Sequence, residues 1–375
     1  MEKFNQEVNA IVVFDLDRAH SQAAAADAAI ARGETWGPLH GVPMTVKESF
    51  DLTGLATTWG LLTLRNNIAT SDAVAVQGLA RRGAVVFGKT NVPTLLADWQ
   101  TFNPIYGTTR NPWDLTRTPG GSSGGAAAAL AAGLTPLELG SDIAASIRNP
   151  AHHCGVYGHK PSFGVVPQGG HAIPGAEIPI DMLVCGPLAR TADDLDTALD
   201  AITGAEAENA PYWKISLAEP RFRQLKEARI AVWLEDDCCR VDSEIQRLIN
   251  SALTVAEAAG GRVDAKARPM QKERTRSMCN YCAVPQAPCC PQTFSKANDS
   301  RPSGSPTMIN RTSPAPCAPS RRRIVHGFWP TGSERCCADN GRLSSRTLTC
   351  CYVPLRPAQR FPTIRRRKGR TGKFK

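Results

Sequence analysis

Residues 118–134 read TPGGSSGGAAAALAAGL, and this stretch decides how the chain is interpreted. A glycine and serine turn gives way to a run of alanine, which has the highest helix propensity and suits tight helix packing. The start of such a helix presents free backbone N–H groups. Taken alone, the stretch is also compatible with a flexible turn before a helix. A functional interpretation therefore depends on the motifs that flank it in the sequence.

The glycine and serine turn does not fit two well-known short motifs, the serine hydrolase elbow and the phosphate-binding loop. Residues 120–124 match the G-x-S-x-G elbow of serine hydrolases, but the preceding NPWDLTRTPG is a loop instead of the apolar strand that the elbow needs. A phosphate-binding loop is excluded because no Gly-Lys-Ser/Thr closes the glycine run.

Helical and strand patterns alternate along the first 268 residues, which indicates an α/β fold. A glycine or a lysine closes several of these segments, with Gly88 ending one strand and Lys47 another. We expect helices over residues 16–32, 71–82, 191–204 and 242–260, and strands over residues 44–46, 84–87, 137–139 and 228–235.

Three segments in order carry a resemblance to a known family: GVPMTVKES (41–49), the stretch 118–134, and LGSDIAASIRNPAHHCGVYGHKPSFGVVP (139–167). Together they resemble the amidase signature family, from about residue 9 to residue 268. The resemblance implies a mixed β-sheet flanked by helices on both faces. Family members usually have additional helices at the start and further helices and a last strand at the end, so we expect a fold that is incomplete at both ends.

The resemblance also implies a catalytic unit of a lysine, a serine held through a cis peptide bond and a nucleophilic serine, which fall on Lys47, Ser122 and Ser146. A serine hydroxyl is a poor nucleophile until a base takes its proton. Lysine serves as that base only if its pKa is lowered enough to give a neutral amine near pH 7. We therefore hypothesise that Lys47 draws a proton through Ser122 from Ser146.

Around this unit the resemblance implies a cis bond between Gly121 and Ser122, a supporting role for Ser123, and an oxyanion hole. The hole would use the backbone N–H groups of Ile143, Ala144, Ala145 and Ser146. The usual family pattern has two glycines where this chain has Ala144 and Ala145. Because alanine tolerates positive φ poorly, we expect a weakened enzyme if either position requires it.

The charged and histidine residues near Ser146 are expected to have structural roles and not catalytic ones. Asp142 and Arg148 resemble the family's scaffolding charges, so we expect an ion pair. A Ser-His triad or a metal site built from His152, His153 and His159 is a poorer alternative. These histidines have no acidic partner at ligand spacing, and the resemblance supplies a mechanism without histidine.

Cysteine and charge divide the chain after residue 268. Residues 269–375 hold 21 of the 44 Lys and Arg but only four of the 34 Asp and Glu, a net charge of +17, whereas the first 268 residues carry −7. Nine of the 13 cysteines also lie there. The overall +10 therefore describes neither part. The earlier Cys154 and Cys185 are expected to be small buried hydrophobic residues.

The tail allows three interpretations. A zinc-stabilised nucleic-acid-binding appendage would use Cys279-x-x-Cys282, but no second such pair or matched histidines follow. A secreted disulfide scaffold conflicts with the cytoplasmic character of the front part. We favour a frameshift near residues 269–276, because the composition changes abruptly and apolar periodicity ends.

We therefore expect a partial amidase signature domain over residues 1–268 and a basic tail, residues 269–375, that is not a folded domain. The expected activity is hydrolysis of a carboxylic amide to an acid and ammonia or an amine, through an acyl-enzyme and without a metal or organic cofactor. One alternative is a glutamyl-tRNA amidotransferase A-like glutaminase subunit. The other is an inactive truncated or frameshifted remnant.

Partners and location follow from the same features. We expect a small-molecule amide substrate, no nucleic acid and no membrane, and we leave a homodimer open. The start has no signal-peptide pattern, and no run of about 18 apolar residues occurs. A cytoplasmic protein is therefore expected.

Overall fold

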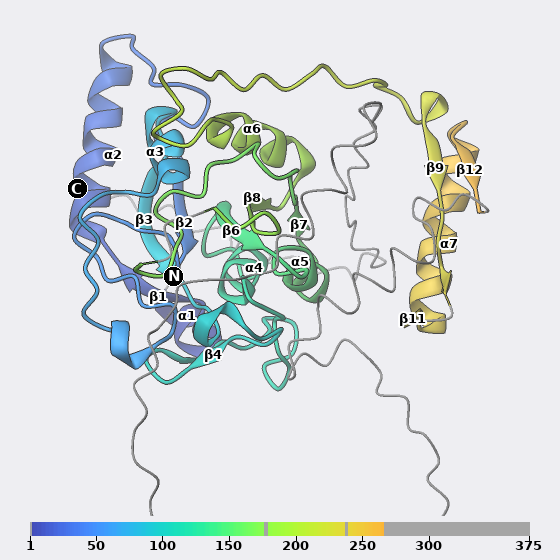
Figure 1. Cartoon of the computed structure of the whole chain (residues 1–375), viewed down its shortest axis with the longest axis horizontal. Helices are drawn as coiled ribbons and strands as arrows, with labels where there is room; N and C mark the ends of the chain where they lie inside the picture. The colour runs from blue at the N-terminus through green and yellow to red at the C-terminus, as the bar shows by residue number, and fades with distance from the viewer. Residues whose placement is uncertain (1, 176–178, 237–238, 266–375) are drawn as a thin grey trace, which may run out of the picture. The chain divides into compact units, whose positions relative to one another are not determined.

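The computed structural model describes residues 2–175, 179–236 and 239–265. Its centre is a six-stranded mixed sheet in the order β1-β3-β2-β6-β8-β7 (Figure 1). Strand β2 runs parallel to β3 and β6, and the other neighbours pair antiparallel. The strands are β1 (Ile11–Phe14), β2 (Pro43–Lys47), β3 (Val85–Thr90), β6 (Leu137–Asp142), β7 (Tyr157–Gly158) and β8 (Val184–Ala189).

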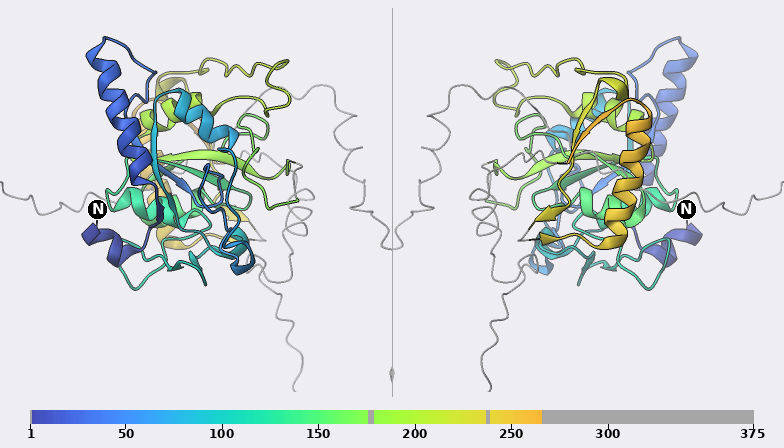
Figure 2. Two further views of the ribbon diagram at one scale, coloured as in Figure 1. Left: turned by 90° about the vertical axis from the view of Figure 1, so that its left-hand side faces the viewer. Right: turned by 90° about the vertical axis from the view of Figure 1, so that its right-hand side faces the viewer.

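Helices cover both faces of this sheet, as expected (Figure 2). On one face α3 (Val74–Arg81) and α6 (Ala192–Ile202) pack over Met44 and Val46 of β2. On the other face α4 (Gly124–Ala131) and α5 (Arg148–Cys154) share a core with Val85 and Phe87 of β3. Alternate side chains of a strand point to opposite faces, which explains how one sheet serves two cores. Helices α1 (Glu2–Val8) and α2 (Leu16–Ala31) precede β2.

Several predicted boundaries are wrong for identifiable reasons. Helix α3 begins at Val74 and not near residue 71, because the Asp72 carboxylate does not cap it and instead accepts hydrogen bonds from Thr53. Strand β3 runs on through Gly88, where a Cβ atom would lie 2.5 Å from the carbonyl oxygen of Val13. This glycine therefore permits close packing of β1 and does not end the strand.

Strand β6 is also longer than predicted, since it continues from residue 139 to Asp142. This extension matters because it brings Ser141 and Asp142 to the carboxyl end of the sheet, in register with Cys185 and Val184 of β8. A small hairpin of β4 (Phe102–Asn103) and β5 (Gly107–Thr108) follows β3.

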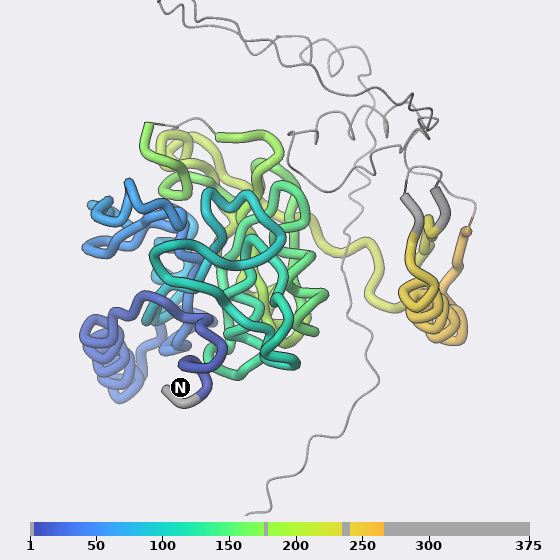
Figure 3. Tube along the Cα trace, turned by 90° about the horizontal axis from the view of Figure 1, so that it is seen from below, coloured from blue at the N-terminus to red at the C-terminus, as the bar shows by residue number. Residues whose placement is uncertain are grey.

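The helix predicted over residues 242–260 is confirmed, whereas the strand predicted over residues 228–235 is shorter in the structure; Figure 3 traces the chain through this region. Strands β9 (Arg229–Ala231) and β12 (Arg262–Asp264) pair in parallel, and helix α7 (Ser243–Ala258) lies between them in sequence. The remaining short elements are β10 (Glu235–Asp236), β11 (Cys239–Arg240) and the 3₁₀ turns η1 (Leu62–Leu64), η2 (Thr94–Leu96) and η3 (Leu225–Glu227).

The interpretations of the tail, including the C-x-x-C motif and the frameshift, concern residues outside the described part of the chain. Within that described part, no helix has the length and apolar character needed to span a bilayer.

Candidate active site

Lys47 ends β2 with its side chain completely buried. Its Nζ lies within hydrogen-bond distance of Ser122 Oγ at 2.7 Å, of Ser141 Oγ at 3.0 Å and of the carbonyl oxygen of Ser141 at 3.4 Å. Burial lowers the pKa of Lys47 to about 7, although Asp142 opposes this effect. The neutral amine is therefore well populated at physiological pH.

The geometry around Nζ suits that neutral form. A neutral amine carries two N–H bonds and one lone pair. The two oxygens of Ser141 can accept both N–H bonds, which leaves the lone pair facing the hydroxyl of Ser122. This arrangement is what a base that removes a proton from Ser122 requires.

The turn that carries Ser122 is fixed by its neighbours. The Gly121–Ser122 peptide bond is cis, as the family resemblance implies. A Cβ atom at Gly121 would lie 2.7 Å from the carbonyl oxygen of Asp98, so only glycine fits there. Ser123 donates its N–H to the Ser146 carbonyl oxygen at 3.1 Å and its hydroxyl to the Ser141 carbonyl oxygen at 3.3 Å. Ser123 thus joins the turn to both other parts of the site.

Asp142 organises the loop that carries Ser146. The completely buried Asp142 carboxylate accepts the backbone N–H groups of Ala145 and Ile147, both at 2.9 Å. It also pairs with the Arg148 guanidinium at 3.0 Å. Burial raises the pKa of Asp142, but the bonds from Arg148 and the backbone outweigh it and hold that pKa below its usual value. The predicted ion pair is therefore present, and it shapes the loop before the buried Ser146.

One of the four backbone donors predicted for the oxyanion hole is already engaged by another group. The N–H of Ala145 is already bonded to Asp142. The N–H groups of Ile143, Ala144 and Ser146 have no hydrogen-bond partner among the described residues. Three donors, and not four, are therefore available for a developing negative charge.

Ala145 adopts a left-handed conformation with φ of 74°. A side chain in this region costs about 1 to 2 kcal/mol relative to the right-handed conformation, and glycine escapes that cost. The loop is held there because Asp142 binds the Ala145 N–H, and the indole N–H of Trp99 donates to the Ala144 carbonyl oxygen at 2.8 Å. One of the two glycine positions of the family pattern therefore does require positive φ.

Ser141 is a site residue that the sequence interpretation missed. It contacts Lys47 through both its hydroxyl and its carbonyl oxygen. The only available signal was its place directly before Asp142, because the predicted strand stopped at residue 139.

The remaining predictions concern three histidines and two cysteines. His152 and His153 are neighbours on α5 with ring centroids 5.6 Å apart, and no group of three potential metal ligands occurs among the described residues. Burial lowers the pKa of His152, His153 and His159. The prediction for Cys154 and Cys185 is confirmed, since both are free and buried.

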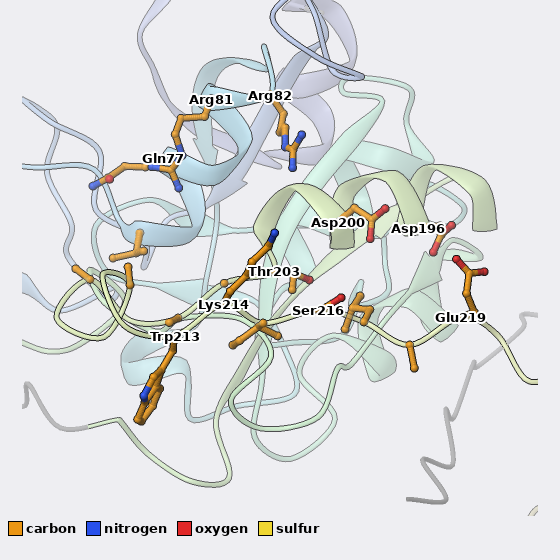
Figure 4. A pocket seen from close by; sticks show the side chains of 18 of the residues that line it. Gln77, Arg81, Arg82, Asp196, Asp200, Thr203, Trp213, Lys214, Ser216 and Glu219 are labelled. Carbon is orange, nitrogen blue, oxygen red and sulfur yellow. The ribbon is translucent and has the colours of Figure 1, made fainter.

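A pocket of about 890 Å³ lies elsewhere, between α3, α6 and residues 203–220 (Figure 4). Arg82 and Lys214 line it together with Asp196 and Asp200. None of Lys47, Ser122 and Ser146 contributes to its wall, so it is separate from the candidate active site.

Comparisons with known proteins identify the family of the chain. The family model for amidases matches residues 1–334, and the chain therefore belongs to the amidase family. This match extends past residue 268, where the composition changes.

The chain is similar to two kinds of curated protein. An acylamidase of Rhodococcus erythropolis is 38% identical over 290 residues, which cover 76% of this chain and 59% of the relative. The A subunit of the glutamyl-tRNA(Gln) amidotransferase of Picosynechococcus sp. is 35% identical over 275 residues, which cover 72% of this chain and 56% of the relative. The chain thus spans less than two thirds of the length of these relatives.

The fold is shared with solved amidase signature enzymes. The structure of a bacterial aryl acylamidase of that family is 31% identical to this chain, with a TM-score of 0.65, and the likeness covers 76% of this chain and 59% of that one. A fatty acid amide hydrolase is 28% identical with a TM-score of 0.64, over 71% of this chain and 48% of that one.

Proposed function

We propose that the chain is an amidase that cleaves a carboxylic amide to an acid and ammonia or an amine. Ser146 is the nucleophile, Ser122 the relay and Lys47 the base. The observation that carries this proposal is the 2.7 Å hydrogen bond between the buried Lys47 amine and the Ser122 hydroxyl, at a site where the pKa of Lys47 is about 7. The acylamidase and aryl acylamidase relatives support the same reaction class.

The proposed reaction has two steps, acylation of Ser146 and hydrolysis of the acyl-enzyme. Lys47 takes the Ser122 proton while Ser122 takes that of Ser146, and Ser146 Oγ forms a bond to the amide carbon. The carbonyl oxygen becomes negative and meets the N–H groups of Ile143, Ala144 and Ser146, each worth about 3 kcal/mol in comparable sites. The proton returns through the relay to the nitrogen, the C–N bond breaks, and water releases the acyl group in the same way.

The test uses the full chain, a fluorophosphonate probe and a simple aryl amide. Wild type should be labelled on Ser146 and should hydrolyse the amide, whereas Ser146→Ala and Lys47→Ala should do neither. Lys160→Ala is the matched control, because Lys160 lies outside the relay and its Nζ donates to the neighbouring Pro161 carbonyl oxygen. Loss of hydrolysis in His152→Ala or His153→Ala, with Lys47→Ala active, would replace the relay by a histidine mechanism.

A second candidate is a glutaminase subunit of a glutamyl-tRNA amidotransferase, and the 35% identity to such a subunit favours it. This function predicts release of ammonia from glutamine only when the partner subunits are present. Aryl amide hydrolysis by the chain alone would select the first candidate.

A third candidate is an inactive remnant, supported by the composition change after residue 268. Soluble protein that neither reacts with the probe nor hydrolyses amides would identify it. Translation of the other two reading frames downstream of residue 268 tests the frameshift, which predicts that one of them continues the family pattern. Cell fractionation tests the proposed cytoplasmic location.

A further inference from the structure

The residues that follow Lys47 form a buried turn, which we call the Lys47 turn (residues 48–51). Phe50 donates its N–H to the carbonyl oxygen of Lys47 at 3.0 Å, and Asp51 donates its N–H to that of Gly170 at 2.8 Å. Ser49 is completely buried, and a hydrogen bond of 3.0 Å joins its hydroxyl to Nε2 of His171. The conformation directly after Lys47 is thus set by contacts with residues 170 and 171.

His171 has few other polar contacts. Its side chain is buried at 2% exposure, and its ring packs against those of Phe50 and Trp59, with centroid distances of 4.4 and 5.1 Å. Its Nδ1 has no hydrogen-bond partner among the described residues. Burial, together with the nearby charge of Lys47, lowers the pKa of His171 to about 3, so the ring is neutral at physiological pH. A buried polar ring is costly unless it is hydrogen-bonded, which makes the bond to Ser49 its principal anchor.

The segment that presents His171 is itself firmly held. The carboxylate of Glu206 accepts the N–H groups of Gln168 and Gly169. The side-chain amide of Gln168 donates to the Leu183 carbonyl oxygen at 2.7 Å. At Gly170, with φ of 76°, a Cβ atom would lie 2.5 Å from the Cα of Ala73. The 168–171 turn is therefore a fixed support and not a mobile loop end.

We propose that His171 is a positioning residue for the reaction: its hydrogen bond to Ser49 holds the Lys47 turn so that the Lys47 amine faces Ser122. This inference rests on the proposed function. His171 touches neither the substrate nor the reacting atoms in this role, since it acts through Ser49 on the backbone of residues 47–51.

The test exploits the two nitrogen positions of the ring. In His171→Gln the side-chain amide can reach the place of Nε2 and keep the bond to Ser49, whereas in His171→Asn it reaches only the place of Nδ1. With the full chain, we expect His171→Gln to keep probe labelling of Ser146 within about threefold of wild type. We expect His171→Asn to lose about tenfold in labelling and in kcat with KM unchanged, the scale of one hydrogen bond.

Ser49→Ala and His171→Asn together form a double-mutant cycle that tests whether the two residues act through one hydrogen bond. Ser49→Ala should show the same tenfold loss in the wild-type background and almost no further loss in His171→Asn, because both changes remove one bond. Additive losses, or equal losses in His171→Gln and His171→Asn, would overturn the proposal. Unfolding midpoints are measured for all variants. A loss of labelling and kcat that only parallels a loss of stability would also overturn the proposal.

If the wild-type chain is not labelled, the proposed function is refuted. The positioning role of His171 is then tested by a second measurement that does not need activity. Amide hydrogen exchange at Phe50 and Asp51 should be faster in His171→Asn and Ser49→Ala than in wild type and His171→Gln. Unchanged exchange in all variants would contradict the positioning role irrespective of activity.

Discussion

Two buried lysines stand on neighbouring parallel strands and differ in their surroundings. Lys47 on β2 contacts serine hydroxyls, and burial lowers its pKa to about 7. Lys89 on β3 donates to the Ala56 carbonyl oxygen at 2.6 Å and to the Thr57 hydroxyl at 3.0 Å. Burial lowers the pKa of Lys89 to about 8, opposed by the negative charges of Glu48 and Asp51. Burial alone therefore does not distinguish a base from a structural cation.

The difference lies in what each amine faces. Lys47 faces the hydroxyl of Ser122, which in the proposed relay gives its proton to Lys47 and takes that of Ser146. Lys89 faces a carbonyl oxygen and a threonine hydroxyl in the loop after the Lys47 turn, so it holds that loop and has no relay to serve. The comparison predicts that one lysine governs activity and the other governs stability.

The largest effect is expected for Lys47→Met. Removal of a general base costs about 10²- to 10⁴-fold in rate, so amide hydrolysis should fall by about 10³-fold or more. Stability should be unchanged or higher, because an apolar side chain replaces a buried amine. Rate assays and urea unfolding measure the two quantities. A Lys47→Met protein that keeps its rate would place the base elsewhere.

Lys89→Met should show the opposite pattern. The change removes the positive charge that acts on the buried Glu48 carboxylate and the two hydrogen bonds of the Lys89 amine, and loss of a charge beside a buried carboxylate costs about 3 kcal/mol in unfolding free energy. The remaining folded molecules should still react with the probe. Urea unfolding and labelling measured below the transition separate the two effects, and an unimpaired stability would show that Lys89 is not the counter-charge of Glu48.

The pH dependence follows from the lowered pKa of Lys47. Activity should rise with pH through about 7, because only the neutral amine accepts a proton. Between pH 7 and the ordinary lysine pKa near 10.4, the unfolded chain binds more protons than the folded chain at this residue. The Lys47 contribution therefore makes stability rise with pH in that window, and Lys47→Met should remove this part of the slope. Unfolding curves measured from pH 7 to 10 check the sign.

Ser141→Ala tests the orientation of the amine. It removes one of the acceptors that direct the lone pair of Lys47 toward Ser122. We expect a loss of about tenfold in kcat, the scale of one hydrogen bond, with little change in KM. Ser141→Thr, which keeps a hydroxyl, is the control and should retain most of the rate. Equal rates for Ser141→Ala and wild type would show that the carbonyl oxygen alone suffices.

The smallest effect concerns Ala145. Ala145→Gly should raise the unfolding free energy by about 1 kcal/mol, because glycine adopts the observed φ of 74° without steric cost. It should also raise the hydrolysis rate, since the loop before Ser146 relaxes. Ala144→Gly is the matched control and should be neutral or slightly destabilising, because positive φ is found at Ala145 and not at Ala144. Identical effects of both changes would show that φ is not the cause.

Much of this architecture could be predicted from the sequence, because it depends on local patterns. The alanine-rich helix after Ser123 and the strand that ends at Lys47 follow from propensity and periodicity, whereas the helices on both faces of the sheet are implied by the family resemblance. The pairing of Lys47 with Ser122 needed the family resemblance, since 75 residues separate them in the chain.

What could not be predicted depends on tertiary contacts. The length of β6, and with it the role of Ser141, is set by its pairing with β8. The positive φ of Ala145 results from bonds to Asp142 and Trp99, which no local pattern reveals. Gly88 resembles a strand end in the sequence, yet it is needed for the close approach of β1.

The most direct measurement is the rate of fluorophosphonate labelling as a function of pH, with the modified residue located by peptide mass spectrometry. For the wild-type chain we predict label on Ser146 and a rate that rises through an apparent pKa near 7, and for Lys47→Met we predict no such rise. Label on a different residue, or the same pH profile in Lys47→Met, would contradict the assignment of Lys47 as the base for Ser146.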